Sequence, residues 1–548
     1  MGEARYHVMR MVVNDYLDAL DVNNPPEPHE IERDLLKNID DEYAVNCCMM
    51  PTTKRWKPPE SLPATVIADV IARINRVSRI SCAGPDADKE HDMLAIYQKD
   101  GPDAGIYVEA SDTVRKLTRK LNYAADERMC MEVLNKLKDI SKRLVRNIDP
   151  DLIAVNNGVF NYKTKQLMDF NEEMVFLAKS YVDYNPNATN VIIHNDDDGT
   201  DWDVESWVAD LTDDDEITNL IWELMSAIIR PNVPWDKSAW LYSESGANGK
   251  SSLCLLMRGL CGEKSYASIP LNAFGQEFML EGLIRATAII TDENEVDMYI
   301  DKIAKLKAVI TGEKLLINRK HKTPIAHTFT GLMVQCLNGF PRVKDRSESY
   351  HRRNLFIPFN KCFTGAERRY IKTYLKNKTV LEYVLFKVLN TNFYELSTPV
   401  KCAMLLDEYK LFNDPVRQFW AEFEEQFVWD LVPFSFMFDL YVNWSKRVNP
   451  SGAPLGKIKF TSDLFNGPLK TSNVWYCHDS KKRTKPSGRM DKPEPLIVEY
   501  DLTNWKNPTY RGTDPNKICK PPLAIKYSGI LRDTAASHAI DEEEAKEA

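Results

Sequence analysis

Apolar runs of strand length alternate with helical repeats in the middle of the chain. Residues 238–242, 288–291 and 331–337 form such runs, and each run is followed by polar residues. The apolar residues between 217 and 228, and again between 253 and 260, recur at the spacing of one helix face. Strands that alternate with helices predict an α/β domain with an open sheet, whose ligands bind at the carboxyl ends of the strands.

The region before this domain shows other patterns. Residues 93–97 and 106–108 predict a β-hairpin, and residues 157–162 predict a second small β element. Between them, Ser111 is expected to begin one long helix that runs toward Arg146.

After residue 400 the pattern changes again. An Asp414-Pro415 pair predicts the start of a helix, residues 436–444 and 455–465 predict two more, and residues 474–489 predict a hairpin. This order suits a winged helix-turn-helix, which places one helix in a DNA groove.

A phosphate-binding loop follows the first apolar run. Residues 244–251 match GxxxxGK[ST] except that Glu244 replaces the first glycine. With a strand before the loop and a helix after it, the motif predicts binding of ATP with Mg²⁺, in which Lys250 contacts phosphate and Ser251 contacts the metal. The predicted nucleotide-binding residues are Gly246, Ala247, Asn248, Gly249, Lys250, Ser251 and Ser252.

The next two apolar runs end in residues that suit ATP hydrolysis. Asp292 and Glu293 follow residues 288–291, and we expect Asp292 to hold Mg²⁺ and Glu293 to activate water. Asn338 follows residues 331–337 and is expected to orient that water, although a turn-forming asparagine has the same pattern. Arg352 and Arg353 are candidates for an arginine supplied to a neighbouring subunit.

A basic run lies between the acid pair and Asn338. Arg319, Lys320, His321 and Lys322 stand at the tip of a predicted hairpin. Such a tip suits contact with DNA phosphates, and a solvated turn is the alternative that the charges alone leave open.

Composition narrows the classes of protein. Hydrophobic residues make up 43% and charged residues 28%, and no apolar run approaches the ~20 residues of a membrane span. The first residues lack the apolar core of a signal peptide, and the eleven cysteines contain no CxxC pair, so we expect a cytoplasmic protein with reduced thiols. The net charge is −9, but residues 441–532 carry 17 Lys and Arg against 7 Asp and Glu, which suggests local contact with a polyanion.

Taken in order, these motifs resemble those of the superfamily 3 helicases, the ring-forming AAA+ motors of small DNA viruses, phages and mobile elements. The matching segments are GANGKSS, AIITDE, INRKHKTP, GLMVQCLNGFP and YHRRNLFIPFN. The basic hairpin is similar to that of papillomavirus replicative helicases, in which a lysine and a histidine engage DNA. The resemblance implies this role for Lys320 and His321.

The chain is more closely similar to the poxvirus-type and phage or plasmid primase-helicase branch. NNGVFNYKTKQL and KSYVDYNP resemble the domain before the motor, and NDPVRQFW and LYVNWSKR resemble the C-terminal region. Only about 90 residues precede the similar part, fewer than a complete primase domain needs, so priming is not expected of this polypeptide.

The resemblance implies a multidomain α/β and α protein. Its centre is an AAA+ P-loop α/β domain, preceded by a mainly helical collar region and followed by a winged-helix-like domain. The expected divisions are an N-terminal accessory region (1–92), a pre-helicase domain (93–205), the helicase domain (206–398), a basic winged-helix-like domain (399–535) and an acidic tail (536–548).

The expected function is that of an ATP-dependent replicative DNA helicase or self-loading replication initiator of a phage or mobile genetic element. It is expected to act as a hexameric ring on single-stranded and forked DNA, to contact origin duplex DNA through its basic domain, and to work in the cytoplasm of a bacterial host. The alternatives are an ATP-switched origin-binding or loading protein, a primase-helicase, and a kinase of a small substrate. The paired arginines and the basic hairpin argue against the kinase.

Overall fold

A computed structural model describes most of the chain as two compact units. The units are Met1–Leu406 and Asp407–Ala548, and each is described by itself. The described residues are 2–296, 298–300, 302–320, 322–343, 345, 347–365, 368–448, 453–477, 483–535 and 538–539. Within these ranges, no helix has the length and apolar character that crossing a bilayer requires.

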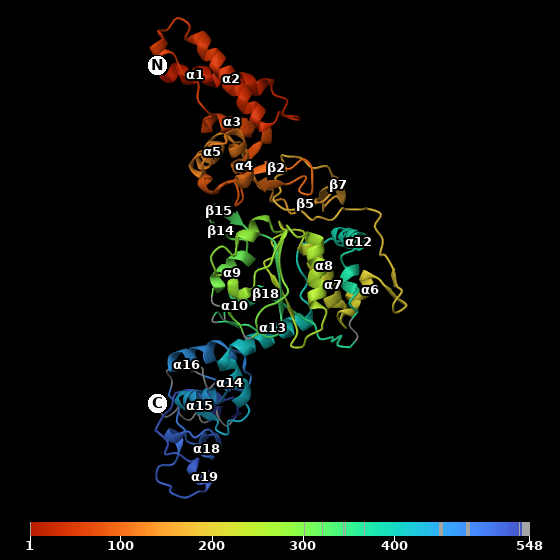
Figure 1. Cartoon of the computed structure of the whole chain (residues 1–548). Coiled ribbons are helices and arrows are strands. Elements are labelled where there is room, and N and C mark those ends of the chain that lie inside the picture. The colour runs from red at the N-terminus through yellow and green to blue at the C-terminus, as the bar shows by residue number, and fades with distance from the viewer. Residues whose placement is uncertain are drawn as a thin grey trace. The chain divides into compact units, whose positions relative to one another are not determined.

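The first unit begins with five helices and a four-stranded sheet (Figure 1). In this sheet β1 (Val77–Ser81) pairs with β2 (Met93–Tyr97) and β4 (Arg143–Val145), and β3 (Tyr107–Glu109) pairs with the other edge of β2. The helices are α1 (Gly2–Ala19), α2 (Pro28–Asn46), α3 (Ala64–Asn75), α4 (Ser111–Leu121) and α5 (Glu127–Ile140), and α3, α4 and α5 lie nearest the sheet. Since β1 pairs with β2, the sheet extends across the boundary expected between residues 92 and 93.

The single long helix expected from Ser111 is wrong, because two helices occupy this stretch. The Asn122 side chain accepts a hydrogen bond from the backbone N–H of Ala124 at 3.0 Å, which turns the chain after α4. Asp126 then caps α5 by accepting from the backbone N–H of Met129 at 2.8 Å. Asn and Asp form such local bonds readily, and these end one helix and begin the next.

Small β elements connect this region to the central domain. Three antiparallel strands form one of them, namely β5 (Leu152–Val155), β6 (Gly158–Asn161) and β7 (Gln166–Met168). β8 (Ile193–Asn195) and β9 (Thr200–Trp202) form a hairpin farther on. The predicted β element at residues 157–162 is confirmed by β6.

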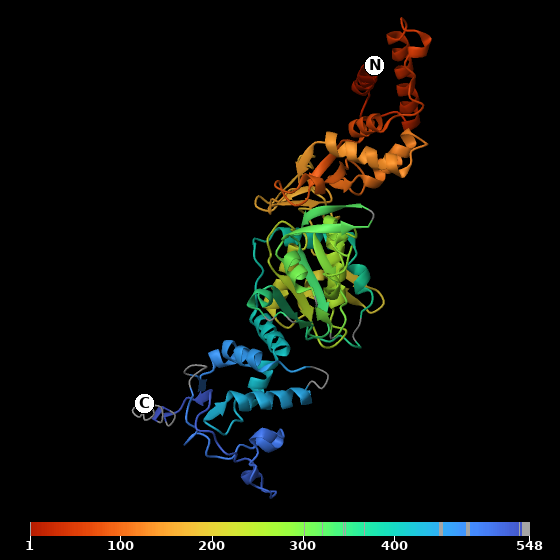
Figure 2. The same ribbon diagram turned by 90° about the vertical axis from the view of Figure 1, so that its left-hand side faces the viewer.

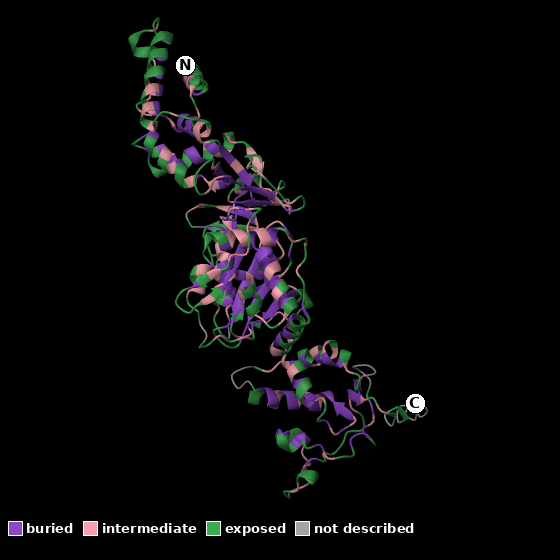
Figure 3. Ribbon diagram, turned by 90° about the vertical axis from the view of Figure 1, so that its right-hand side faces the viewer, coloured by how far each residue is buried: buried purple, intermediate pink, exposed green. Residues whose placement is uncertain are grey.

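A five-stranded parallel sheet forms the centre of the first unit. Its strands, in spatial order, are β11 (Tyr266–Ala267), β12 (Ala288–Thr291), β16 (Leu332–Leu337), β10 (Ser238–Tyr242) and β18 (Asn354–Pro358). Every residue of the last four is buried, as a parallel sheet covered on both faces requires (Figure 3). The predicted α/β domain with an open sheet is therefore present.

Helices cover both faces of this sheet. Figure 1 shows α7, α8 and α12 on one side and α9 on the other. The helices of the domain are α6 (Val204–Asp210), α7 (Asp215–Ala227), α8 (Lys250–Cys261), α9 (Ile303–Ile310), α10 (Glu348–His351), α11 (Ile371–Tyr374) and α12 (Lys378–Leu389).

A hairpin projects from the connection between β12 and β16 (Figure 2). β14 (Lys314–Arg319) and β15 (Lys322–Thr328) pair antiparallel, with Arg319 opposite Lys322. Lys320 lies in the turn after β14, and His321 lies outside the described residues.

The second unit combines helices with a three-stranded sheet of order β19-β21-β20. Asp414 caps α14 by accepting from the backbone N–H groups of Val416 and Arg417, as predicted. The elements are α14 (Pro415–Phe423), β19 (Leu431–Pro433), α15 (Phe434–Val448), α16 (Lys457–Asn466), α17 (Pro468–Thr471), β20 (Trp475–Tyr476), α18 (Leu496–Glu499), α19 (Pro515–Ile518) and β21 (Gly529–Arg532). α13 (Val400–Asn413) contains the point where the two units divide.

The partner of β20 comes from much farther along the chain than expected. Trp475 pairs with Arg532 and Tyr476 with Leu531, so β21 takes the place of the partner predicted within residues 474–489. Residues 478–482 of that predicted hairpin lie outside the described residues. The winged-helix-like assignment stays a prediction, and of the expected acidic tail, 536–548, only residues 538–539 are described.

Candidate active site

The phosphate loop joins β10 to α8 in an unusual backbone conformation. Gly249 precedes α8 with φ +82°, and Ala247 also has a positive φ of 56°. A Cβ at Gly249 would lie 2.5 Å from Cδ2 of Leu211, whereas a Cβ at Gly246 would meet nothing within 4 Å. The positive φ of Gly249 therefore favours glycine there, and a Cβ would in addition displace the end of the Leu211 side chain.

Hydrogen bonds hold the loop against the chain that follows β18. The backbone N–H of Phe363 donates to the carbonyl of Ala247 at 2.8 Å. The Asn248 amide donates to the Lys361 carbonyl at 2.5 Å and to Ser245 Oγ at 3.2 Å. The Glu244 carboxylate, which replaces the first glycine of the motif, is exposed and accepts from the Tyr242 hydroxyl at 3.1 Å.

The first residue of α8 suits an anionic ligand. Lys250 is buried, and burial lowers the pKa of its ammonium group. Among the described residues, no carboxylate lies within ion-pair distance of this ammonium. A phosphate at the start of the helix would supply the missing negative charge. Ser251 is exposed on the next position, and Ser252 is half-buried.

Asp292 is held by an arginine that sequence analysis did not select. Arg258, on α8, donates from Nη2 to Asp292 Oδ1 at 2.7 Å and from Nη1 to Oδ2 at 3.2 Å. This pairing holds the pKa of Asp292 below its usual value, although burial opposes it. Glu293, the next residue, is exposed. The sequence feature that could have indicated Arg258 is its place on the helix of Lys250, as a charged residue among the apolar residues of that helix.

The sheet brings Asn338 between the loop and the acid pair. β16 lies between β10 and β12, with Leu337 opposite Tyr242 and Gln335 opposite Thr291. Because all three strands are parallel, their carboxyl ends meet at one edge. Asn338 is exposed at that edge. Sequence analysis also missed Asn294, whose amide donates to Gln335 Oε1 and to the Cys336 carbonyl, both at 3.0 Å, and so fixes the acidic loop to β16.

The two candidate arginines lie at the amino ends of the parallel strands, opposite the phosphate loop. Arg352 and Arg353 precede β18, and the carbonyl of Arg353 accepts from the backbone N–H of Ser238 at the start of β10. A five-residue strand spans about 16 Å, so neither side chain reaches the phosphate loop of its own chain. Arg352 is exposed, while Arg353 donates to Ser349 Oγ at 2.9 Å.

The basic hairpin is divided by its contacts. Lys320 is exposed at the turn, beside His321, which is not described. Arg319 and Lys322, in contrast, both contact Glu109, at 2.8 Å and 3.2 Å. The structure thus brings one part of the predicted DNA-binding set to the surface and holds the other part against β3.

The residues at the sheet edge fit a nucleotide with its metal. The buried ammonium of Lys250 and the loop backbone at Gly249 suit a phosphate group. The Ser251 hydroxyl and the Asp292 carboxylate are oxygen ligands of the kind that Mg²⁺ prefers, and both oxygens of Asp292 accept from Arg258 in this structure. These residue types match the predicted ATP and Mg²⁺ site, which would require Asp292 to exchange Arg258 for the metal.

Three family models match successive segments of the chain. Residues 52–213 match "D5 N terminal like", residues 241–353 match a "Family of unknown function (DUF5906)", and residues 412–486 match "Poxvirus D5 protein-like". The second segment contains the phosphate loop, the acid pair, the basic hairpin, Asn338 and both arginines. The comparison with curated proteins finds no match.

The comparison with solved structures lists structures of the NrS-1 C-terminal region. An A-form apo structure is 12% identical, covers 86% of this chain and 99% of its own, and has a TM-score of 0.40. A second apo structure is 12% identical, covers 78% of this chain and 98% of its own, and has a TM-score of 0.41.

Proposed function

Since the chain belongs to the poxvirus D5-like family of superfamily 3 primase-helicases, we propose that it is an ATP-dependent replicative DNA helicase and self-loading initiator of a phage or mobile genetic element. The observation that carries this proposal is the division of catalytic groups between the two edges of the parallel sheet. The loop, the acid pair and Asn338 share one edge, and Arg352 and Arg353 lie at the other.

This division supports a ring in which each nucleotide lies between two subunits. Arg352 and Arg353 lie too far from the phosphate loop of their own chain, so as catalytic groups they would serve the site of a neighbouring subunit. A closed ring, expected to be a hexamer, satisfies that requirement for every subunit at once.

Each residue then has a specific role in hydrolysis. Lys250 and the backbone N–H groups of the loop bind the phosphates, Glu293 accepts the proton of the attacking water, and Asn338 orients that water. Ser251 and Asp292 would hold Mg²⁺, which neutralises charge on the phosphate oxygens when bound. Arg352 or Arg353 of a neighbour stabilises the charge that develops on the transferred group.

The basic hairpin is proposed to couple hydrolysis to DNA. Lys320 and His321 at its turn would contact the backbone of one strand of single-stranded or forked DNA, and the basic second unit would contact origin duplex. ATP hydrolysis at the carboxyl ends of the sheet strands would move the hairpin along the DNA strand that it contacts.

Strand displacement on a forked duplex tests this function. The wild type is expected to unwind the fork in an ATP-dependent manner, Lys250→Ala to lose ATP hydrolysis, and Lys320→Ala to retain hydrolysis but lose unwinding. ATP turnover by the wild type without any strand displacement would instead identify an ATP-switched loading protein. Primer synthesis on a bare template would identify a primase-helicase.

A further inference from the structure

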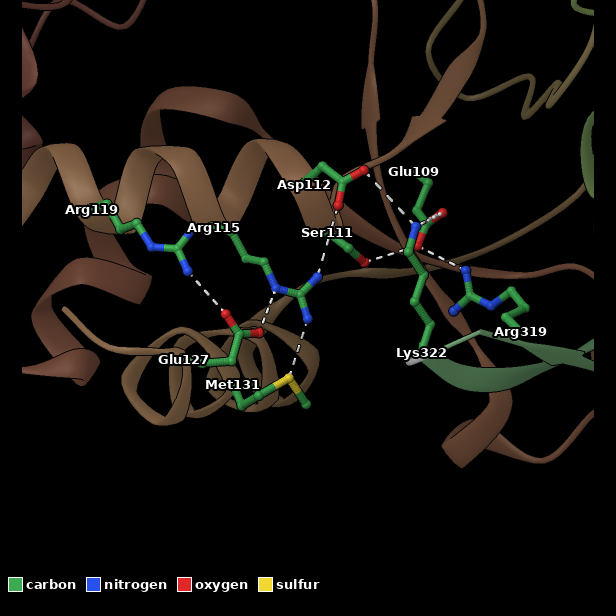
Figure 4. A network of polar contacts seen from close by, with 9 residues as sticks. All are labelled: Glu109, Ser111, Asp112, Arg115, Arg119, Glu127, Met131, Arg319 and Lys322. Atoms are coloured by element: carbon green, nitrogen blue, oxygen red, sulfur yellow. Dashed lines mark hydrogen bonds and ion pairs between the residues drawn. The ribbon is translucent and has the colours of Figure 1, made fainter.

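The carboxylate of Glu109 is the centre of a polar network between the four-stranded sheet and the basic hairpin (Figure 4). It ends β3, and its Oε1 accepts from Arg319 Nη1 at 2.8 Å and from Ser111 Oγ at 2.9 Å. Its Oε2 accepts from Lys322 Nζ at 3.2 Å. One acidic side chain therefore binds two of the four basic residues of the hairpin.

Arg319 also closes the turn of the hairpin. Its Nε and Nη2 donate to the carbonyl of Thr323 at 3.0 Å and 2.8 Å, so three of its nitrogens are engaged. Only 6% of its side chain is exposed, compared with 24% for Lys322. Because its side chain is 6% exposed and three of its nitrogens already donate hydrogen bonds, this guanidinium is poorly placed to bind a DNA phosphate.

A second contact holds the other end of the same strand. The backbone N–H of Thr328, the last residue of β15, donates to the carbonyl of Cys82 just after β1, at 3.5 Å. The three residues before it, Ile325 to His327, are buried. β15 is thus attached to the N-terminal sheet at both ends, while much of β14 is exposed.

We propose that Glu109 is a positioning residue that anchors the hairpin to the N-terminal sheet, so that Arg319 and Lys322 act through it and only the turn residues grip DNA. This inference rests on the proposed function for its DNA part. It divides the basic run into an anchor, formed by Arg319 and Lys322, and a contact point that includes Lys320.

The charges around Glu109 keep its carboxylate ionised and so maintain its ion pairs with the hairpin. Burial raises the pKa of Glu109, but Arg319, Lys322 and Ser111 outweigh it, so the carboxylate stays ionised and its pKa lies below the usual value. If the carboxylate were neutralised, Arg319 would remain buried with an uncompensated positive charge, which strongly destabilises such an arrangement. The hairpin would then leave the sheet to hydrate that charge.

Hydrogen exchange in the full chain tests the anchor without DNA. The amides of residues 314–328 are compared in the wild type, Glu109→Gln and Asp112→Asn. Asp112 is a matched control because it is a neighbouring acid 4.0 Å from Lys322 and its side chain is 74% exposed. We expect exchange to be on the order of tenfold faster in Glu109→Gln and unchanged in Asp112→Asn, since local opening sets the exchange rate.

Equal exchange in all three proteins would overturn the anchor. If Glu109→Gln does not fold, Glu109→Asp decides, because it keeps the charge on a side chain too short to reach both cations. Exchange faster than in Asp112→Asn supports the anchor, and exchange equal to that control rejects it.

DNA-stimulated ATP hydrolysis tests the division of the basic run. Misplacement of the hairpin is expected to lower the stimulation by about tenfold or more in Glu109→Gln, while hydrolysis without DNA stays unchanged. The double variant Glu109→Gln/Arg319→Gln should lose no more stimulation than the worse single variant, because both changes break the same Glu109–Arg319 ion pair. Losses that multiply would mean that Arg319 contacts DNA by itself.

The salt dependence of DNA binding separates the two proposals. Loss of one phosphate contact lowers the slope of log K against log salt by about 1. We expect this decrease for Lys320→Ala and not for Glu109→Gln. If the wild type shows no DNA-stimulated hydrolysis, the helicase proposal fails while the exchange experiment still judges the anchor. If the wild type is stimulated and Glu109→Gln matches it, the anchor alone fails.

Discussion

Replacing Gly249 by alanine should disable the phosphate loop through its backbone. Gly249 has φ +82°, and a left-handed conformation costs a residue with a Cβ roughly 1–2 kcal/mol. The new Cβ would lie 2.5 Å from Cδ2 of Leu211, which is itself buried, and pushing that side chain from its rotamer costs about 0.5–1.5 kcal/mol more. The total is about 1.5–3.5 kcal/mol, unless the loop itself moves.

Thermal unfolding and titration with a fluorescent ATP analogue measure both outcomes. A loss of about 1.5–3.5 kcal/mol lowers Tm by roughly 3–14 °C for a domain of about 200 residues. If the loop moves instead, its N–H groups no longer point at the phosphates, and ATP affinity should fall at least about tenfold, equivalent to ~1.4 kcal/mol.

Gly246→Ala is the matched control, because a Cβ there meets nothing within 4 Å. It should lower the free energy of unfolding by less than about 0.5 kcal/mol. Since Gly246 belongs to the predicted nucleotide site, it is a control for the unfolding measurement alone. A Gly249→Ala protein with wild-type Tm and affinity, or a Gly246→Ala protein with as low a Tm as Gly249→Ala, would refute the assignment of strain to Gly249.

Three further predictions concern charged groups. Arg258→Met should lower the free energy of unfolding by about 1–2 kcal/mol without nucleotide, a value that allows for the partial exposure of Asp292. The difference in Tm from the wild type should shrink when Mg²⁺ and a non-hydrolysable ATP analogue are added. An unchanged difference would mean that Arg258 keeps its bond to Asp292 in the loaded site. Mixing Lys250→Ala subunits with Arg352→Ala/Arg353→Ala subunits should restore some ATP hydrolysis, because an intact loop then faces intact arginines; no recovery in mixed rings that assemble normally argues against an arginine supplied in trans. Folding lowers the pKa of Glu109, so its ion pairs stabilise the folded chain at pH values above the usual carboxyl pKa, and this stabilisation is lost as the pH falls through the lowered pKa. Between about pH 5 and pH 3, Tm should therefore fall more steeply in the wild type than in Glu109→Gln. Parallel curves of Tm against pH would contradict this.

The sheet edge was predictable because each strand is buried on both faces. Such strands appear in the sequence as continuous apolar runs, and the polar residue after each run marks the carboxyl end. Asp292 and Asn338 were found in this way, and β12 and β10 have the predicted bounds. The spatial order, with β16 between β10 and β12, is a pairing between distant segments that the runs themselves do not specify.

The positioning residues were not predictable, because they also depend on contacts between distant segments of the chain. Glu109 and Arg319 are 210 residues apart in sequence, and neither spacing nor composition joins them. Ser111 illustrates the difficulty, since its position suggested a helix cap, whereas its hydroxyl donates to Glu109 instead. A basic run at a hairpin tip suggests contact with DNA, but only the three-dimensional contacts separate Arg319 from Lys320.

The order of these parts along the chain suggests how nucleotide and hairpin communicate. From the acid pair after β12, the chain passes through α9 to the hairpin, then through β16 to Asn338, and on to α10 and Arg352. Lys307 of α9 binds Asp345, just before α10, at 2.7 Å, which ties the two connections together. Residues at both ends of the sheet strands and both ends of the hairpin lie on this single stretch, so in the proposed ring a displacement at either nucleotide interface would reach the hairpin through this stretch. An anchor at Glu109 would then pass the same displacement to the N-terminal sheet, so that the hairpin and this sheet move as one body against the strand of DNA.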